Sequence, residues 1–300
     1  MYRLAYVLLA LTTLFWGGNA VAGKLAVGHI SPMLLTGARW TLACACLLPF
    51  AWPRLKHDWA AARKSLLFLF VLGGVGFSAY NLAFYTALLH TTAVNGSIEH
   101  AAMPLVVFVL NFLIFGTRVT GLQVVGFLLS VVGVGVAASH GDPQRLLALD
   151  LNRGDALMML AVLFYGGYTV MLRYKPAIHW QTMMVALTFS AAVTSVPFIA
   201  YEFASGSGIW PDKQGWLIVV YTVVFPSLLA QSFYIRGVEL IGANRAGLFI
   251  NLVPIFGTLL AILIIGEVFE PYHALAIVLV LGGIGLAEWS GRRAAPRGDS

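Results

Sequence analysis

Charge is what this chain has least of. Asp, Glu, Lys and Arg together make up 10% of the 300 residues, whereas soluble domains average about 25%. Hydrophobic residues make up 60% of the chain. A water-soluble protein of this length cannot bury so much apolar surface, but a lipid bilayer accepts it in helical spans of about 20 apolar residues. The composition therefore excludes a soluble domain and predicts an all-α membrane protein.

Cysteine is nearly absent. Cys44 and Cys46 are the only two. Because they lie two positions apart in a predicted helix, they point to different faces and cannot readily form a disulfide with each other. We interpret both as residues that fill the packed core.

Motifs for catalysis and nucleotide binding are missing as well. The sequence holds no GxxxxGK[ST] phosphate loop, no HExxH motif and no pair of acidic residues spaced to hold a magnesium–diphosphate. It also lacks a Ser or Cys nucleophile with an evident base. We therefore expect no enzymatic activity, no cofactor, no metal site and no ATP-driven transport within this chain.

What the chain does have is long apolar segments. Ten of them are long enough to cross a bilayer, at roughly 4–22, 33–52, 66–89, 94–115, 120–138, 155–172, 181–201, 215–235, 244–265 and 272–290. The connections between them are short. The longest, about 139–154, leaves no room for a soluble domain. The sequence thus predicts ten transmembrane helices.

Basic residues are distributed unevenly over the connections. If the N-terminus lies inside, the cytoplasmic segments hold 13 of the 18 Lys and Arg residues and the outer segments hold 4. Such a bias fixes the orientation of a membrane protein, so the net charge of +6 does not indicate nucleic-acid binding. We expect a multi-pass protein of a bacterial-type inner membrane, with N- and C-termini both cytoplasmic.

The second half of the chain repeats the first. An offset of 150 residues pairs Pro104 with Pro254 and Gly116 with Gly266, and an offset of 149 pairs FWGG at 15–18 with FYGG at 164–167. Five spans per copy is an odd number, so the second copy must enter the membrane from the opposite side. Two inverted five-helix repeats are a recurrent carrier architecture, and the solute site then lies near the midplane between the repeats.

The repeat sets the expected domain boundaries. Residues 1–139 form the first five-helix repeat, 140–154 a periplasmic linker, 155–290 the second repeat and 291–300 a cytoplasmic tail. The triplet at 20–22 (AVA) resembles a signal-peptidase site. Cleavage there would remove a segment whose counterpart in the second half is internal, so we expect the first helix to be retained.

Four stretches of the second half carry a family resemblance: Gly242-Ala243-Asn244-Arg245-Ala246, Val253-Pro254-Ile255-Phe256, Gly266-Glu267 and Gly282-Gly283-Ile284-Gly285. They resemble the EamA module of the drug/metabolite transporter superfamily, and the first half is a weaker copy of that module. The resemblance covers about 4–290. It implies ten transmembrane helices in two repeats and the efflux of small metabolites. Overall similarity favours the branch of amino acid and aromatic amino acid exporters.

The first copy departs from the family pattern at one acidic position. Thr117 stands where the second copy has Glu267. A functional role for this acid therefore cannot be symmetric. The alternative is that Glu267 caps the end of its own helix.

Polar residues within the spans are costly in a bilayer and indicate functional positions. Glu99 and His100 come one turn before Pro104, and Arg39 lies at a comparable depth in another span. One interpretation is a Glu99–Arg39 ion pair that holds two helices together. The other is that Glu99 or His100 faces the pathway and binds a substrate amino group or a proton.

Pro104 and Pro254 occupy equivalent mid-helix positions, where each removes a backbone hydrogen bond. Paired helix breaks in two halves of a carrier indicate its binding site, although a packing kink without a ligand is the alternative. Asn251, one turn before Pro254, is placed to contact a substrate or the freed backbone groups. Glycines in 120–138 and 272–290 (Gly126, Gly133, Gly135, Gly282, Gly283 and Gly285) are expected to be packing positions.

Aromatic and polar residues also share helix faces. Phe77, Tyr80, Asn81 and Phe84 lie on one face of the third span, and Ser227, Gln231 and Tyr234 on one face of the eighth. Trp16 and Tyr165 occupy equivalent positions in the two copies, where helix contacts are the first expectation and cavity lining the second. The candidate substrate-binding residues are therefore Trp16, Tyr80, Phe84, Glu99, His100, Tyr165, Gln231, Tyr234 and Asn251.

These features predict a secondary transporter that exports amino acids, aromatic ones among them, or similar small metabolites, by alternating access at a central cavity. The alternatives are a carrier or channel for another small metabolite, such as a nucleobase or a drug-like cation. An intramembrane enzyme would need polar residues gathered at one interface, whereas here they are spread over two halves at mid-depth. The expected partners are a small-molecule substrate and the lipid bilayer, with no nucleic acid and no obligatory protein partner.

Overall fold

The computed structural model describes residues 2–116, 120–142, 144, 152–241, 246 and 249–294, and all regular structure in them is helical. The candidate Thr117, most of the predicted linker 140–154 and the end of the tail lie outside these residues. The helices of the first half are α1 (Tyr2–Leu25), α2 (Pro32–Ala62), α3 (Leu66–Gly73), α4 (Tyr80–Ala87), α5 (Ala93–His100), α6 (Met103–Phe115) and α7 (Gly121–Ala138). Those of the second half are α9 (Arg153–Met171), α10 (Trp180–Ala204), α11 (Lys213–Thr222), α12 (Ala230–Ile241), α14 (Val253–Leu260) and α15 (Pro271–Ala294).

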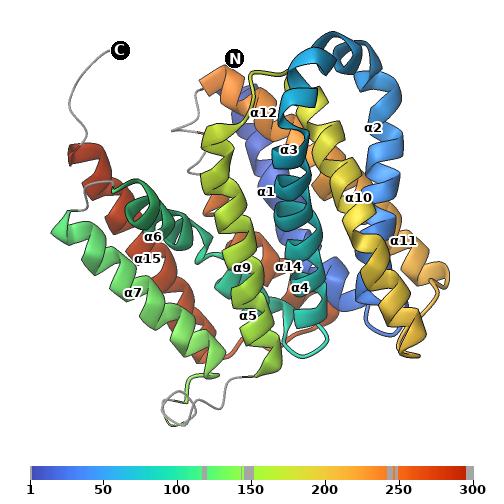
Figure 1. Cartoon of the computed structure of the whole chain (residues 1–300). Helices are drawn as coiled ribbons and strands as arrows, with labels where there is room; N and C mark the ends of the chain where they lie inside the picture. Colours follow the sequence, from blue (N-terminus) through green and yellow to red (C-terminus); the bar gives the residue numbers. More distant parts are fainter. Residues whose placement is uncertain are drawn as a thin grey trace.

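Seven helical stretches of the described chain are long and apolar enough to cross a membrane, and two shorter apolar helices, Val253–Ile265 and Pro271–Ala287, accompany them. The longest stretch, Pro32–Ala87, has 56 residues and turns back on itself between α2 and α3 (Figure 1). The chain is therefore a multi-pass membrane protein. The start of α1 and the end of α15 lie at the same end of the molecule (Figure 1).

Helices α2 and α10 pack side by side in opposite directions (Figure 1). The Glu202 carboxylate near the end of α10 accepts hydrogen bonds from the backbone N–H groups of Met33 (3.1 Å) and Leu34 (3.0 Å) at the start of α2. In return, Asp58 on α2 accepts one from the N–H of His179 (2.8 Å), directly before α10. A carboxylate at a helix N-terminus satisfies free donors and opposes the helix dipole. Each of the two helices thus supplies a carboxylate that caps the N-terminus of the other.

Helices α7 and α15 form a second antiparallel pair, at one side of the molecule (Figure 1). A Cβ atom added at Gly283 would collide with the Gly126 carbonyl and with Ser130. The Ser130 hydroxyl also donates to the Val280 carbonyl across the interface (3.1 Å). Glycine is needed here because the two backbones approach closely.

Not all the glycines expected to pack do so. Gly282 and Gly285 have open space where a Cβ would stand, so the packing role predicted for them is wrong. The core-filling role predicted for Cys46 is also wrong, because this residue is exposed, while Cys44 is half-buried. Both cysteines are free thiols.

The neighbouring glycines of α15 give a matched stability test. We expect Gly283→Ala to destabilise the protein by about 1–3 kcal/mol, as overpacking does. Gly282→Ala meets no neighbour and should leave stability unchanged or raise it by up to about 1 kcal/mol, because alanine favours helix. Thermal unfolding of the two purified variants in the same detergent measures the difference. Equal melting temperatures for the two would contradict the described packing of α7 on α15.

Candidate solute-binding cavity

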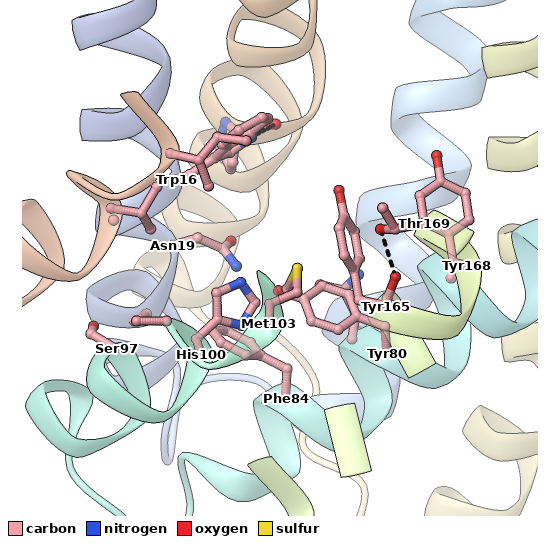
Figure 2. A pocket seen from close by; sticks show the side chains of 18 of the residues that line it. Trp16, Asn19, Tyr80, Phe84, Ser97, His100, Met103, Tyr165, Tyr168 and Thr169 are labelled. Atoms are coloured by element: carbon pink, nitrogen blue, oxygen red, sulfur yellow. Dashed lines mark hydrogen bonds between the residues drawn. The ribbon is translucent and has the colours of Figure 1, made fainter. Parts of the chain in front are cut away.

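A cavity of about 890 Å³ lies between the two halves of the chain. Its walls come from α1, α2, α4, α5, α6, α9, α12, α14 and α15, and from two π-helical segments, Gly74–Ala79 and Val223–Leu229. A volume of this size is typical of small-molecule sites. The lining is mostly apolar and aromatic, with a few polar side chains. Figure 2 shows the side chains of part of this lining.

Eight of the nine candidate residues line this cavity: Trp16, Tyr80, Phe84, His100, Tyr165, Gln231, Tyr234 and Asn251. They come from five different helices, α1, α4, α5, α9 and α12, and from the helix break before α14. The ninth candidate, Glu99, does not line the cavity. It is fully buried on another side of α5. The polar and aromatic helix faces read from the sequence thus meet around one space.

One wall of the cavity is an aromatic cluster. The Tyr80 ring lies 5.0 Å from the ring of Tyr165 and 5.7 Å from that of His100, centroid to centroid. The Phe84 ring stands edge-on to His100 at 5.8 Å. Figure 2 shows Tyr80, Phe84 and His100 gathered together, with Tyr165 beside Tyr80. Rings in such tilted and edge-on arrangements attract one another and form a preformed surface for an apolar or aromatic group.

Two helix breaks bring polar groups to the cavity. The helix that contains α5 and α6 is interrupted at residues 101–102, and the turn at residues 251–252 precedes α14. Each new helix has proline at its second position. Because Pro104 and Pro254 have no N–H, they cannot donate to the carbonyl groups of His100 and Ile250. The breaks predicted from the prolines are therefore present, with His100 and Asn251 beside them.

Two π-helical segments also shape the cavity. They span Gly74–Ala79 and Val223–Leu229, which are equivalent positions under the repeat offset. A Cβ at Gly76 would collide with the Tyr168 ring, so the first segment lets α9 approach closely. In the second segment, Pro226 lines the cavity and its carbonyl accepts a hydrogen bond from the Trp16 indole (3.2 Å). The extra residue in a π-helical turn is often found at functional sites.

Arg39 is the charged residue of the cavity wall, and it is 5% exposed. Its Nε donates to the Ser227 hydroxyl (2.8 Å). Its Nη1 donates to Asn19 Oδ1 (3.0 Å), Asn81 Oδ1 (3.1 Å) and the Tyr85 hydroxyl (2.6 Å). All four acceptors are neutral oxygens. The guanidinium thus joins the first half of the chain to the second while its charge stays uncompensated by any carboxylate in the described residues.

The predicted ion pair between Glu99 and Arg39 is therefore wrong. Counting residues along the spans puts Arg39 and Glu99 at comparable depth, but Glu99 projects towards α9, where its carboxyl group interacts with that of Asp155. Sequence reasoning missed the four partners of Arg39 as a set. The sequence places Asn81 and Ser227 on polar helix faces. The spacing of the residues does not indicate that one arginine bonds both of them.

The Glu267 backbone N–H donates to the Ala261 carbonyl (3.3 Å) and so caps the end of its own helix, as the alternative drawn from the sequence states, but its side chain bonds elsewhere. Its carboxylate accepts hydrogen bonds from the N–H groups of Ala93 (2.8 Å) and Val94 (2.9 Å), and so caps the start of α5. Nearby, Lys24 Nζ donates to the carbonyls of Leu88 (3.0 Å) and Thr91 (2.7 Å). The Glu267 contacts connect the two halves, and the Lys24 contacts hold the turn before α5 within the first half. Together they fix α5, which carries His100 into the cavity.

Comparison with known proteins agrees with this arrangement. The sequence profile of the EamA-like transporter family matches residues 3–139 and again residues 152–288. The chain belongs to the EamA-like transporter family. EamA-family proteins are transporters rather than enzymes, so this protein is a multi-pass membrane transporter of small molecules.

Relatives of this EamA-family chain cover nearly its whole length. It is 26% identical to "Uncharacterized transporter YetK" of Bacillus subtilis, over 93% of this chain and 85% of that one. It is 24% identical to "Uncharacterized inner membrane transporter YicL" of Salmonella typhimurium, over 95% of both chains. A solved crystal structure shares the fold, with a TM-score of 0.64 and 19% identity over 98% of this chain and 99% of that chain.

Proposed function

We propose that this EamA-family protein is a secondary transporter that exports amino acids, aromatic ones among them, or similar small metabolites by alternating access. The observation that carries the proposal is an aromatic wall combined with one buried cation, Arg39, in a cavity whose described lining holds no carboxylate. An amino acid offers a side chain for the wall and a carboxylate for the guanidinium. Its ammonium group can be met by Asn251, Gln231 and the ring faces.

The same proposal includes ten spans in two inverted five-helix repeats, with both termini cytoplasmic in an inner membrane. Four observations support it. The family profile matches twice, the π-helical segments and the helix breaks recur at equivalent positions, α2 and α10 run in opposite directions, and the chain ends lie on the same side (Figure 1). The name of the Salmonella relative describes an inner membrane transporter. Two inverted halves can pack in two conformations of similar energy, one with the cavity open to the cytoplasm and one with it open to the outside.

The cavity is less suited to the alternative substrates. A drug-like cation would meet the positive charge of Arg39 in a low-dielectric environment, where repulsion is strong. A nucleobase would stack on Tyr80 and Tyr165, but it lacks the full negative charge that complements a guanidinium. Competition between transported solutes separates these alternatives, and stimulation of efflux by substrate on the far side separates a carrier from a channel.

The carboxylate requirement is tested with two solutes of nearly equal shape. Protein in liposomes should exchange labelled L-phenylalanine for unlabelled L-phenylalanine across the membrane. L-Phenylalaninamide, which lacks the carboxylate, should compete about tenfold to a hundredfold less well, because a hydrogen bond to a charged group contributes about 1.5–3 kcal/mol.

The variant Asn81→Asp tests whether Arg39 is the group that binds the substrate carboxylate. It places a carboxylate on Arg39 in the position of the present Asn81 acceptor, so the guanidinium no longer attracts a substrate anion. We expect this variant to lose the preference for L-phenylalanine over its amide. If wild-type protein exchanges label but treats both solutes alike, Arg39 does not bind the substrate carboxylate. If no amino acid is exchanged, the proposed substrate class is wrong.

The polar groups at the two helix breaks should both contact solute. We expect His100→Ala and Asn251→Ala each to lower L-phenylalanine exchange several-fold, because each removes a side chain from the cavity wall. Asn111→Ala is the control, since Asn111 bonds only its own helix at the Val107 carbonyl (2.9 Å) in the described chain and does not line the cavity. Unchanged exchange by both cavity variants would remove these residues from the site.

A further inference from the structure

A pair of acidic side chains lies behind the cavity wall. Glu99 on α5 is 0% exposed, and Asp155 in the first turn of α9 is 1% exposed. Their carboxyl groups lie within hydrogen-bonding reach of each other. Yet no N–H or hydroxyl group in the described chain donates to either Glu99 oxygen or to Asp155 Oδ2. The Thr91 hydroxyl donates to the remaining oxygen, Asp155 Oδ1 (2.7 Å).

No Lys, Arg or His of the described residues forms a direct ion pair with either carboxyl group, although His140 lies close enough to Asp155 to attract its charge. The helices and segments packed against α5 present these titratable groups: Lys24 from α1, Asp155 from α9, His140 after α7, Glu267 and Glu270 before α15, and Tyr272 and His273 from α15. Lys24 bonds backbone carbonyls. His273 Nε2 bonds Asn95 Oδ1 (3.1 Å), and His140 Nδ1 bonds the Tyr272 hydroxyl (3.2 Å).

Two ionised carboxylates cannot stay side by side in such a place. Burial removes their hydration and the like charges repel, so one of them must carry a proton, which then forms an O–H···O hydrogen bond between the two. The pair titrates as a unit. The described conformation, in which α5 packs on α9, therefore requires at least one bound proton.

We propose that Glu99 and Asp155 form the binding site for a proton that is exchanged for solute. The proposal rests on the transport function proposed above. When the pair takes a proton from water on one side, an O–H bond forms and α5 packs on α9. When that O–H bond breaks, the negative charges must be hydrated, which favours the arrangement open to the other side.

The position of Glu99 provides the link to solute. It directly precedes His100, whose ring lines the cavity and whose Nδ1 is buried without a hydrogen-bond partner in the described chain. The helix break at residues 101–102 follows immediately. A movement of α5 that opens the carboxyl pair to water therefore also moves His100 and the aromatic wall around it.

The test uses full-length protein in liposomes with labelled L-phenylalanine and a pH difference of one unit, the membrane potential being held at zero. Exchange of one proton per solute should drive about tenfold accumulation in wild type, since one pH unit corresponds to about 1.4 kcal/mol. Glu99→Gln should still exchange L-phenylalanine for L-phenylalanine but should not accumulate it. Asp155→Asn should behave in the same way.

Glu270→Gln is the matched control, because Glu270 is an exposed acid before α15. It should accumulate solute as wild type does. The proposal is overturned if wild type exchanges L-phenylalanine without responding to the pH difference, or if Glu99→Gln accumulates it normally.

Infrared spectroscopy tests the pair without transport. Purified wild type at neutral pH should show the carbonyl band of a protonated carboxylic acid, and Glu99→Gln should lose it, because Asp155 alone can ionise beside donors from Thr91 and the new amide. Absence of the band in wild type contradicts the proposal. If no L-phenylalanine moves but the band behaves as expected, the proposed substrate fails while the proton site stands.

Discussion

The buried guanidinium of Arg39 is the interaction on which the cavity depends. Moving a cation out of water costs several kcal/mol unless hydrogen bonds replace its hydration. Here four neutral oxygens, on Asn19, Asn81, Tyr85 and Ser227, provide that replacement. They fix α1, α2, α4 and the second π-helical segment around one point. Because none of them is negative, the charge is solvated but not cancelled, and it remains available to an anion.

The two halves repeat their backbone but not their chemistry. Helix breaks occur at residues 101–102 and 251–252, and π-helical turns at Gly74–Ala79 and Val223–Leu229. Glu99 and His100, in contrast, correspond to Phe249 and Ile250 under the offset of 150. Unique side chains in the first half then supply the acidic pair and the imidazole, so the symmetric frame carries an asymmetric site.

Much of the cavity could be predicted from the sequence, because proline positions and helix periodicity are local. Tyr80, Phe84 and Gln231 follow from shared helix faces, and Asn251 from its place before Pro254. The wrong Glu99–Arg39 pair shows the limit of such reasoning. Successive helical residues point about 100° apart, and here His100 lines the cavity while Glu99 faces α9. Residue counts give depth but not this rotation. The π-helical turns have no signature in composition and could not be predicted.

The central claim is that Arg39 holds the carboxylate of a transported solute. A structure determined with L-phenylalanine bound tests it most directly. The account predicts the carboxylate within hydrogen-bonding distance of the Arg39 guanidinium and the ring against Tyr80 and Tyr165. A ligand bound in the cavity with its carboxylate away from Arg39 would contradict it.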